Sequence, residues 1–431
     1  MISVFFILFS IIHLIIIRHF YKKMNIKSFA ANPIVIVSIF FYIIHILLPF
    51  AQWEDNFFRY KSSYDEETYI LSILLMFIAF IIFVVSFQIS YSRRILNWKA
   101  IVFDNRNYAT IPIKKNIYIT IIVFFIGLFF VYKNLSIIML IGQDEYLRDR
   151  IGFGFSNGIQ MLLTHWVYIS CIIFFFLFKI AKKKYVKKIA FLLFIFSFLI
   201  TILYYSMNSN RNSIFLLFLI LIIVNMMFVT KSFNNINIIK NAVVIVIAVT
   251  LFFQIGKYRN IYMQDYSITH AINGSFGNHE NIVWLMSNNY DLQYGRTYLA
   301  GLTNFVPRRI WPDKPVGAGP ILKNFIYPHS YVIGESGNSS LTTGFYTELM
   351  MNFGLFGIFV FSILYGIFLK KIYLLLLKER RPFVFLFFLY SLILFSSQIL
   401  YAEFLGFFSR YVLTSIPFIF LILMNKKYKY L

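Results

Sequence analysis

Near its centre, the longest polar interruption of this chain reads Tyr294-Gly-Arg-Thr-Tyr-Leu-Ala-Gly-Leu-Thr-Asn-Phe-Val-Pro-Arg-Arg-Ile-Trp-Pro-Asp-Lys-Pro315. The interruption runs from Ile255 to Tyr346, and on both sides of it apolar stretches alternate with short charged connectors. Only 13% of the residues are charged and 60% are hydrophobic, whereas about a quarter of the residues in a soluble protein are charged. The sequence therefore predicts an all-α polytopic membrane protein that forms a single integral membrane domain over 1–431.

Eleven apolar stretches of roughly 16 or more residues are each long enough to cross about 30 Å of hydrocarbon. They lie near 2–17, 31–51, 69–90, 117–132, 161–178, 189–207, 213–230, 241–256, 346–369, 382–400 and 404–424. The first stretch resembles a signal peptide, but no basic region precedes it and no small-residue cleavage site follows it. We therefore expect it to be an uncleaved helix.

Lysine and arginine are concentrated in alternate connectors. Six connectors hold 26 of these residues and only two acidic ones, Asp104 and Glu379; they are 18–30, 91–116, 179–188, 231–240, 370–381 and 425–431. The positive-inside rule then puts the N-terminus outside, the C-terminus in the cytoplasm and the loop 257–345 on the extracytoplasmic face. The same distribution accounts for the net charge of +23, so we expect no binding to nucleic acid.

The loop 257–345 is predicted to combine helical and irregular segments. Residues 266–290 have patchy helical periodicity, which favours one or two amphipathic helices that lie on the membrane. Five of the ten prolines fall within 307–328 and predict an ordered but irregular strap. Cys171 is the only cysteine, which excludes an intrachain disulfide.

Arg211 is the first candidate for binding a ligand. It lies in a polar hairpin, Asn208-Ser-Asn-Arg-Asn-Ser213, between two apolar stretches. An ionisable side chain within the hydrocarbon costs about 2.5–3.5 kcal/mol and usually lines a cavity when it persists. Arg211 therefore either extends to outer lipid head groups or binds a phosphate or another anion.

Other arginines are candidates for the same anion, because guanidinium groups pair with phosphate oxygens in a bidentate manner. The candidates in the loop are Arg259, Arg296, Arg308 and Arg309, and Arg148 lies in a separate charged run, 144–150. Salt bridges to loop aspartates are the structural alternative for each of them.

Glu348 and His279 are the candidates for proton transfer. Glu348 begins a predicted span and shares a helical face with Asn352 at a spacing of four residues. A carboxylate that is partly removed from water can serve as a general base. The alternatives are an ion pair with a loop arginine and a negative charge that interacts favourably with the helix dipole. His279, next to Glu280, is the second candidate, although a lone histidine is more often structural. Glu403 and Arg410, seven residues apart, are expected to lock helices together rather than to react.

The chain contains no spacing typical of a zinc site, no Walker motif and no DxD-like pair that would face the cytoplasm. We therefore expect no cofactor and no metal. A donor used at the outer face must then arrive already activated, and a lipid pyrophosphate meets that requirement.

Three segments resemble the Wzy-type O-antigen and capsule repeat-unit polymerases. They are Phe305-Val-Pro-Arg-Arg-Ile-Trp-Pro-Asp-Lys-Pro315, Glu348-Leu-Met-Met-Asn-Phe-Gly-Leu-Phe-Gly357 and the Asn-Arg-Asn-Ser turn at Arg211. The resemblance extends to the layout of nearly the whole chain, with about eleven spans and one large outer loop. The matched motifs carry only Arg211, Arg308, Arg309, Glu348 and Asn352.

The resemblance implies a metal-independent glycosyltransferase of the GT-C kind in the bacterial cytoplasmic membrane. Such an enzyme transfers a growing glycan from undecaprenyl pyrophosphate onto a lipid-linked repeat unit at the outer face. The expected partners are the lipid-linked oligosaccharide, the bilayer, a chain-length regulator and a flippase. An O-antigen ligase and a transporter of the same lipid-linked sugar are the alternatives.

Overall fold

The computed structural model describes residues 2–23, 30–89, 112–141, 158–208, 210–228, 246, 249–251, 253–255, 268–333, 335 and 340–426. Every regular element within these ranges is a helix, which confirms the all-α prediction. The long helices are α1 (Ile2–Lys23), α5 (Glu66–Ile89), α6 (Ile113–Ile141), α9 (His165–Ile180), α10 (Lys184–Met207), α11 (Arg211–Met227), α17 (Phe345–Lys378), α18 (Pro382–Ser396) and α20 (Phe404–Met424). The shorter ones are α3 (Pro33–Tyr42), the π-helix η1 (Ile43–Leu47), α4 (Leu48–Glu54), α13 (Ile268–Phe276), α14 (His279–Ser287), α15 (Arg296–Leu302), α16 (Ala318–Ile326) and α19 (Gln398–Tyr401).

Nine helices in the described ranges are long and apolar enough to cross a membrane. They coincide with nine of the eleven predicted spans. The predicted span 213–230 corresponds to the shorter apolar helix Arg211–Met227. The predicted span 241–256 lies mostly outside the described residues. The structure therefore supports a polytopic membrane architecture, with nine candidate spans among the described residues.

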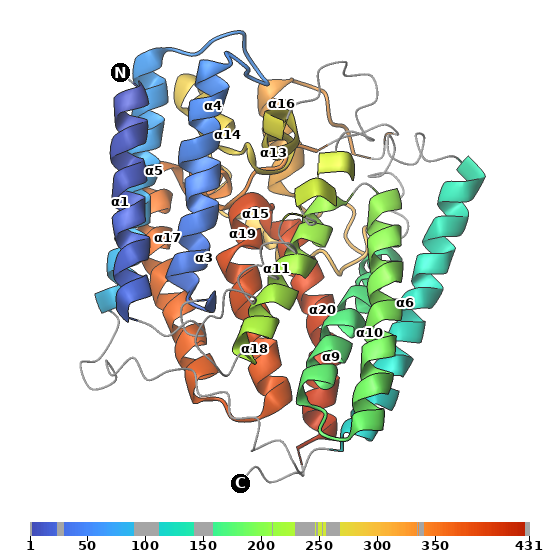
Figure 1. Ribbon diagram of the computed structural model, residues 1–431. Coiled ribbons are helices and arrows are strands. Elements are labelled where there is room, and N and C mark those ends of the chain that lie inside the picture. The colour runs from blue at the N-terminus through green and yellow to red at the C-terminus, as the bar shows by residue number, and fades with distance from the viewer. Residues whose placement is uncertain are drawn as a thin grey trace.

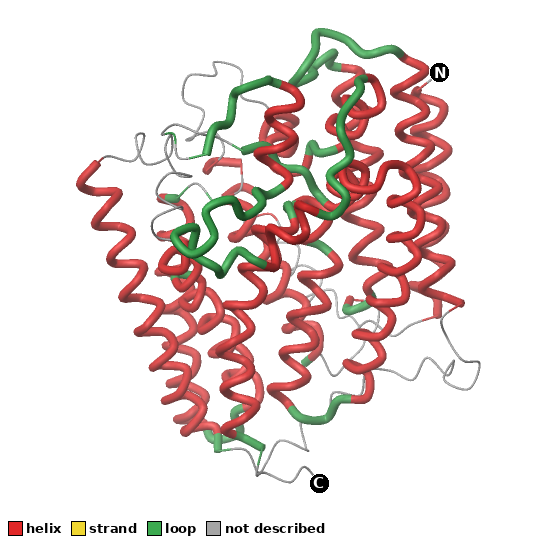
Figure 2. Tube along the Cα trace, turned by 180° about the vertical axis from the view of Figure 1, so that it is seen from behind, coloured by secondary structure: helices red, strands yellow, loops and turns green. Residues whose placement is uncertain are grey.

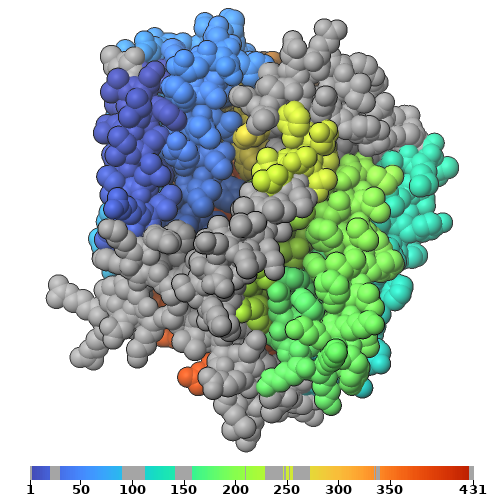
Figure 3. Space-filling model, in the orientation of Figure 1, coloured from blue at the N-terminus to red at the C-terminus, as the bar shows by residue number. Residues whose placement is uncertain are grey.

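The helices form an elongated bundle in which α1 begins at one end and α20 finishes at the other (Figure 1). Most of the described loops lie toward the end where α1 begins, as the view from behind shows (Figure 2). We call this the loop end, defined by residues 55–65 and the described part of 288–344. The opposite end, which we call the basic end, holds residues 181–183, 379–381 and Lys426. On one face of the bundle, α1 and α3 lie at one side and α10 and α6 at the other (Figure 3).

Small residues allow two pairs of long helices to approach closely, as is common in membrane bundles. At Gly366 of α17, a Cβ atom would lie 2.7 Å from the carbonyl oxygen of Phe83 on α5. At Gly127 of α6, it would lie 2.7 Å from the backbone nitrogen of Val167 on α9. Backbone contact at these glycines therefore fixes the two pairs.

Three of the described spans are interrupted. The π-helix η1 separates α3 from α4, Gly354 in α17 has φ 62° and ψ −157°, and Ser397 separates α18 from α19. Irregular backbone at membrane depth is tolerated where protein or water surrounds it. The breaks in α17 and after α18 lie next to the site described below.

One or two amphipathic helices are predicted within 266–290, and two are present, α13 and α14, but α14 does not lie on the surface. Residues His279 to Leu285 are all buried, and α14 packs against α5 and α17. Its polar side chains have partners inside the bundle, which removes the need for a solvated face. The predicted strap 307–328 is irregular only in its first part, because α16 forms within it.

We expect Gly366→Ala to lower the thermal midpoint of the purified protein, because the added methyl group has no room between α17 and α5. Overpacking of this kind typically costs about 1–3 kcal/mol. Gly158→Ala is the matched control, since no atom lies within 4 Å of its Cβ position. An equal loss of stability in both variants would contradict the close approach at Gly366.

Candidate functional site

Glu348 lies in the first turn of α17, where its carboxylate joins three helices. The Thr297 hydroxyl of α15 donates to Oε1 at 2.6 Å, and the Phe404 backbone nitrogen of α20 donates to Oε2 at 2.7 Å. The side chain is 1% exposed. Both oxygens are thus held by neutral donors, and the residue ties α15 and α20 to α17.

Asn352 lies one turn further along the same helical face, as predicted. Its Oδ1 accepts from the Gly295 nitrogen at 2.9 Å, and its Nδ2 donates to Thr297 Oγ1 at 2.8 Å and to the Glu348 carbonyl at 2.7 Å. Gly295 has φ 87°, a left-handed conformation that glycine adopts without strain. The amide of Asn352 therefore positions the start of α15, and these contacts use its hydrogen-bonding capacity.

Glu403 stands beside Glu348, at the junction between α19 and α20. Its Oε2 accepts from the Gly319 nitrogen at 2.9 Å. A Cβ atom at Gly319 would lie 2.8 Å from this oxygen, and one at Gly317 would lie 3.2 Å from it. The two glycines therefore pack closely around the carboxylate and form a cradle for it. A side chain at either position would crowd the carboxylate.

The second oxygen of Glu403, Oε1, has no hydrogen-bond partner among the described residues, and the side chain is partly exposed. Burial raises the pKa of this carboxyl above its usual range. Glu403 also acts electrostatically on Glu348, and neither carboxylate has an ion-pair partner in the described part of the chain. Of the two, Glu403 is the one that keeps an oxygen open to an incoming group.

Half-buried aromatic rings pack against one another near these carboxylates. Tyr298 of α15 stacks parallel to Phe353 at 6.1 Å between ring centroids, and Phe353 stacks on Phe361 at 5.2 Å. Phe404 meets Tyr298 edge-on at 5.1 Å and stacks on Phe408 at 5.3 Å. The Tyr298 hydroxyl is buried without a hydrogen-bond partner. A polar group that binds next to Glu348 could therefore pair with it.

His279 does not lie in an open site. Its Nδ1 is 3.1 Å from His45 Nδ1, its Nε2 is 2.9 Å from Ser72 Oγ, and its ring is fully buried. Burial lowers its pKa to about 3, so the ring is neutral. Ser72 donates to the Tyr69 carbonyl, which leaves its oxygen to accept from His279 Nε2. These contacts assign His279 a packing role and give no support to the hypothesis that it is a base.

Glu280, next to it, anchors an external loop. Its Oε1 accepts from the backbone nitrogens of Arg59 at 2.7 Å and Tyr60 at 3.0 Å and from the Tyr64 hydroxyl at 3.2 Å. Burial raises the pKa of this carboxyl, while these donors lower it. Glu280 therefore holds the segment 59–64 onto α14.

Arg211 is the first residue of α11 and is 7% exposed. One guanidinium nitrogen lies 2.5 Å from the position of a Cβ atom at Gly274 on α13, so the side chain packs on the α13 backbone. The start of α11 thus packs against α13.

The loop arginines have different surroundings. Arg308 donates to the carbonyls of Pro312 at 2.9 Å and Lys314 at 3.1 Å, and so holds its own strap in shape. Arg296 and Arg309 are exposed. Arg148 and Arg259, the remaining predicted ligands of the substrate, lie outside the described residues.

Glu403 and Arg410 each join α20 to another helix, in agreement with the prediction that they lock helices together. Glu403 contacts Gly319, whereas Arg410 donates from Nη1 to Ser213 Oγ on α11 at 3.3 Å. Each side chain therefore links α20 to a separate element. The Nε of Arg410 is buried without a hydrogen-bond partner.

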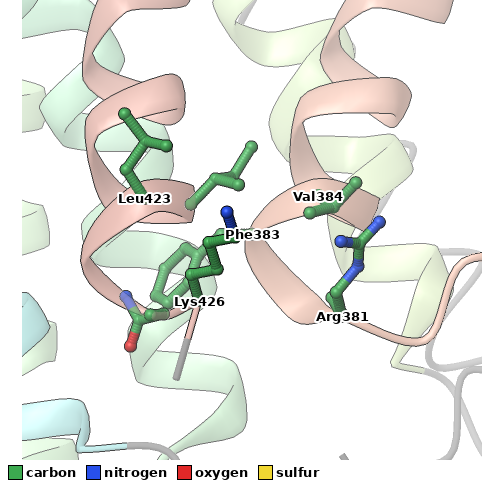
Figure 4. Close-up of a pocket in the computed structure, with 7 residues that line it drawn as sticks. Arg381, Phe383, Val384, Leu423 and Lys426 are labelled. Carbon is green, nitrogen blue, oxygen red and sulfur yellow. The ribbon is translucent and has the colours of Figure 1, made fainter. Parts of the chain in front are cut away.

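A small pocket at the basic end lies far from these groups. It is lined mainly by apolar side chains of α18 and α20, with Arg381 and Lys426 at its rim (Figure 4). Arg381 pairs with Glu379 at 2.8 Å. In the described ranges, no three His, Cys, Asp or Glu side chains gather to hold a metal ion. The carboxylates at the loop end are therefore the stronger candidates for chemistry.

Gly319→Ala is expected to displace the Glu403 carboxylate, because the new methyl group would lie 2.8 Å from Oε2 and would also clash with the Leu341 carbonyl. A loss of about 1–3 kcal/mol is typical of such overpacking. Gly406→Ala is the control, since its Cβ would be 3.8 Å from the nearest atom of Glu403. Thermal unfolding of the two purified variants measures the difference, and equal midpoints would argue against the cradle.

The chain matches no protein-family model, no curated protein and no solved structure. We therefore infer the function from the residues of this chain and from their arrangement at the loop end.

Proposed function

We propose that the chain is a membrane glycosyltransferase that polymerises undecaprenyl-pyrophosphate-linked oligosaccharide repeat units at the outer face of the bacterial cytoplasmic membrane. The observation that carries the proposal is the carboxylate of Glu403. It has one anchored and one open oxygen, stands beside a second buried carboxylate and has no cation paired with it in the described ranges. The motif resemblance at Arg211, Pro307–Pro315 and Glu348 supports the same chemistry.

Glu403 acts as the general base in this proposal. Its open oxygen accepts the proton of an acceptor hydroxyl as that oxygen forms a bond to the anomeric carbon of the donor glycan. The bond between the anomeric carbon and the phosphate oxygen breaks, and undecaprenyl pyrophosphate leaves with the electron pair. Glu348 is a positioning residue, because its hydrogen bond from the Phe404 nitrogen fixes the backbone next to Glu403.

Cations at the loop end stabilise the leaving group in this proposal. Negative charge develops on the pyrophosphate in the transition state, and fixed positive groups lower its energy most in a site with little water. Arg211 is buried beside α13, whereas Arg296 and Arg309 are exposed and able to meet an incoming ligand. Arg308 already supports the strap through two backbone carbonyls.

The aromatic rings fit a lipid-linked sugar as the substrate. Tyr298, Phe353 and Phe361 offer parallel, half-buried faces next to the carboxylates. Such faces suit both the apolar side of a sugar ring and the first units of a prenyl chain. They provide a surface on which the acceptor is held while its hydroxyl points to Glu403.

Glu403→Gln is predicted to lower kcat for chain extension by about 10²–10⁴-fold, as is typical for loss of general base catalysis. The assay uses purified full-length protein and a synthetic prenyl-diphosphate oligosaccharide. The base acts only when it is deprotonated. Because the pKa of Glu403 is raised, kcat/KM of the native protein should begin to fall at a pH above the usual pKa range of glutamate as the solution is acidified. In Glu403→Gln, kcat/KM should no longer fall with pH in this range.

The exposed Glu67 supplies a matched control, and Glu67→Gln should leave both rate and pH profile unchanged. A Glu403→Gln protein that extends chains at the native rate would remove Glu403 from the mechanism.

Cells that lose this chain are predicted to display single repeat units on their surface instead of long polymer. The length distribution of extracted polysaccharide on a gel measures this outcome. Long chains that accumulate on the carrier lipid would instead indicate a ligase.

A further inference from the structure

Arg410 is a cation within a membrane-spanning helix that has no carboxylate partner in the described part of the chain. It lies on α20, a candidate span, and among the described residues its hydrogen bond goes to the neutral hydroxyl of Ser213. Glu403, the nearest acid along α20, binds Gly319 instead. No carboxylate of the described residues therefore neutralises the charge of Arg410.

The guanidinium group of Arg410 retains unused donors. It carries five N–H groups, of which Nη1 serves Ser213 and Nε is buried without a partner. A buried donor without a partner is destabilising, and more so when it is charged. This cost indicates that an acceptor occupies the position when the protein works.

Tyr168 of α9 offers a second unused donor in the same region. The residue is 4% exposed, its hydroxyl is buried without a hydrogen-bond partner, and the charge of Arg410 acts on it. The nearby Tyr390 differs, because its hydroxyl donates to Thr414 at 2.7 Å. Two donors without acceptors thus lie within electrostatic range of each other.

The first turn of α11 adds positive potential to this region. Ser213, the partner of Arg410, is two residues from Arg211. The N-terminus of a helix also carries a partial positive charge. An Arg410 that merely extended to lipid head groups would not be tied to α11 inside the bundle.

The position of Arg410 along α20 relates it to Glu403. The two residues are seven positions apart, which corresponds to about 10 Å along a helix and to nearly the same face. A bound sugar diphosphate between them would present its sugar to the carboxylate and its phosphates to the cation.

We propose that Arg410 and Tyr168, with Arg211 at the start of α11, form the binding site for the diphosphate of a lipid-linked sugar. Arg410 lies about 10 Å further along α20 than Glu403. The inference relies on the proposed function only for the identity of the ligand. The unused donors of Arg410 and Tyr168 call for an acceptor whatever reaction follows.

The test measures binding without turnover. Purified full-length protein in detergent is titrated with geranylgeranyl diphosphate, inorganic pyrophosphate or phosphatidylglycerol, and the thermal midpoint is followed. A ligand that binds only the folded protein raises the midpoint with concentration. The native protein should respond to geranylgeranyl diphosphate at concentrations at least tenfold lower than to either other ligand.

Arg410→Gln should weaken binding of geranylgeranyl diphosphate at least tenfold, and Tyr168→Phe several-fold. Because the Tyr168 hydroxyl has no partner, Tyr168→Phe should leave the midpoint of the unliganded protein unchanged or raise it. This variant keeps the test decisive if Arg410→Gln fails to fold. Arg381→Gln, at the basic end, is the control and should bind as the native protein does.

Native affinity in both Arg410→Gln and Tyr168→Phe would overturn the proposal, as would an equal response to phosphatidylglycerol or to pyrophosphate alone. Diphosphate binding that depends on Arg410, in a protein that makes no polymer, would support this site and refute the polymerase. Polymer synthesis by the native protein, together with unchanged diphosphate binding in both variants, would support the polymerase and refute this site.

Discussion

The hydrogen bonds of the Glu348 carboxylate connect the parts of the structure on which the account depends. One oxygen holds Thr297 of α15 and the other holds the start of α20 at Phe404. Because the side chain is buried, the loss of either donor would leave an acceptor unpaired away from water. The position of Glu403, immediately before Phe404, follows from this contact. Glu348, which the sequence predicts as a base, thus supports the position of Glu403, which we propose as the base.

Features governed by short-range pattern were predictable from the sequence. Apolar length predicted the spans, and the spacing of Glu348 and Asn352 predicted their shared helical face, since both depend only on helix geometry. The hairpin at Arg211 was predictable as well, because polar residues between two apolar stretches must lie at an end of the bundle. Each of these inferences needs no knowledge of a distant partner.

Features governed by long-range partners were not predictable. The solvated face expected for α14 is absent because His279 and Glu280 find partners in η1, α5 and the segment 59–64, more than 200 residues earlier in the chain. The spacing of Glu403 and Arg410 places both on one face of α20, but it does not reveal that one contacts Gly319 and the other Ser213. The sequence offers one signal that these two residues are functional, namely the cost of placing a charge next to hydrocarbon. This signal does not distinguish a functional site from a structural ion pair, because the cost applies to both.

In the proposed reaction, α20 carries the proton acceptor at its start and the cation for the leaving diphosphate two turns later. A structure of the full-length protein with a prenyl-diphosphate saccharide bound tests this arrangement most directly. The account predicts phosphate oxygens within hydrogen-bond distance, about 3 Å, of the Arg410 guanidinium and the Tyr168 hydroxyl, with the sugar facing Glu403 Oε1. A ligand that contacts neither Arg410 nor Tyr168 and leaves Glu403 facing no sugar would contradict it.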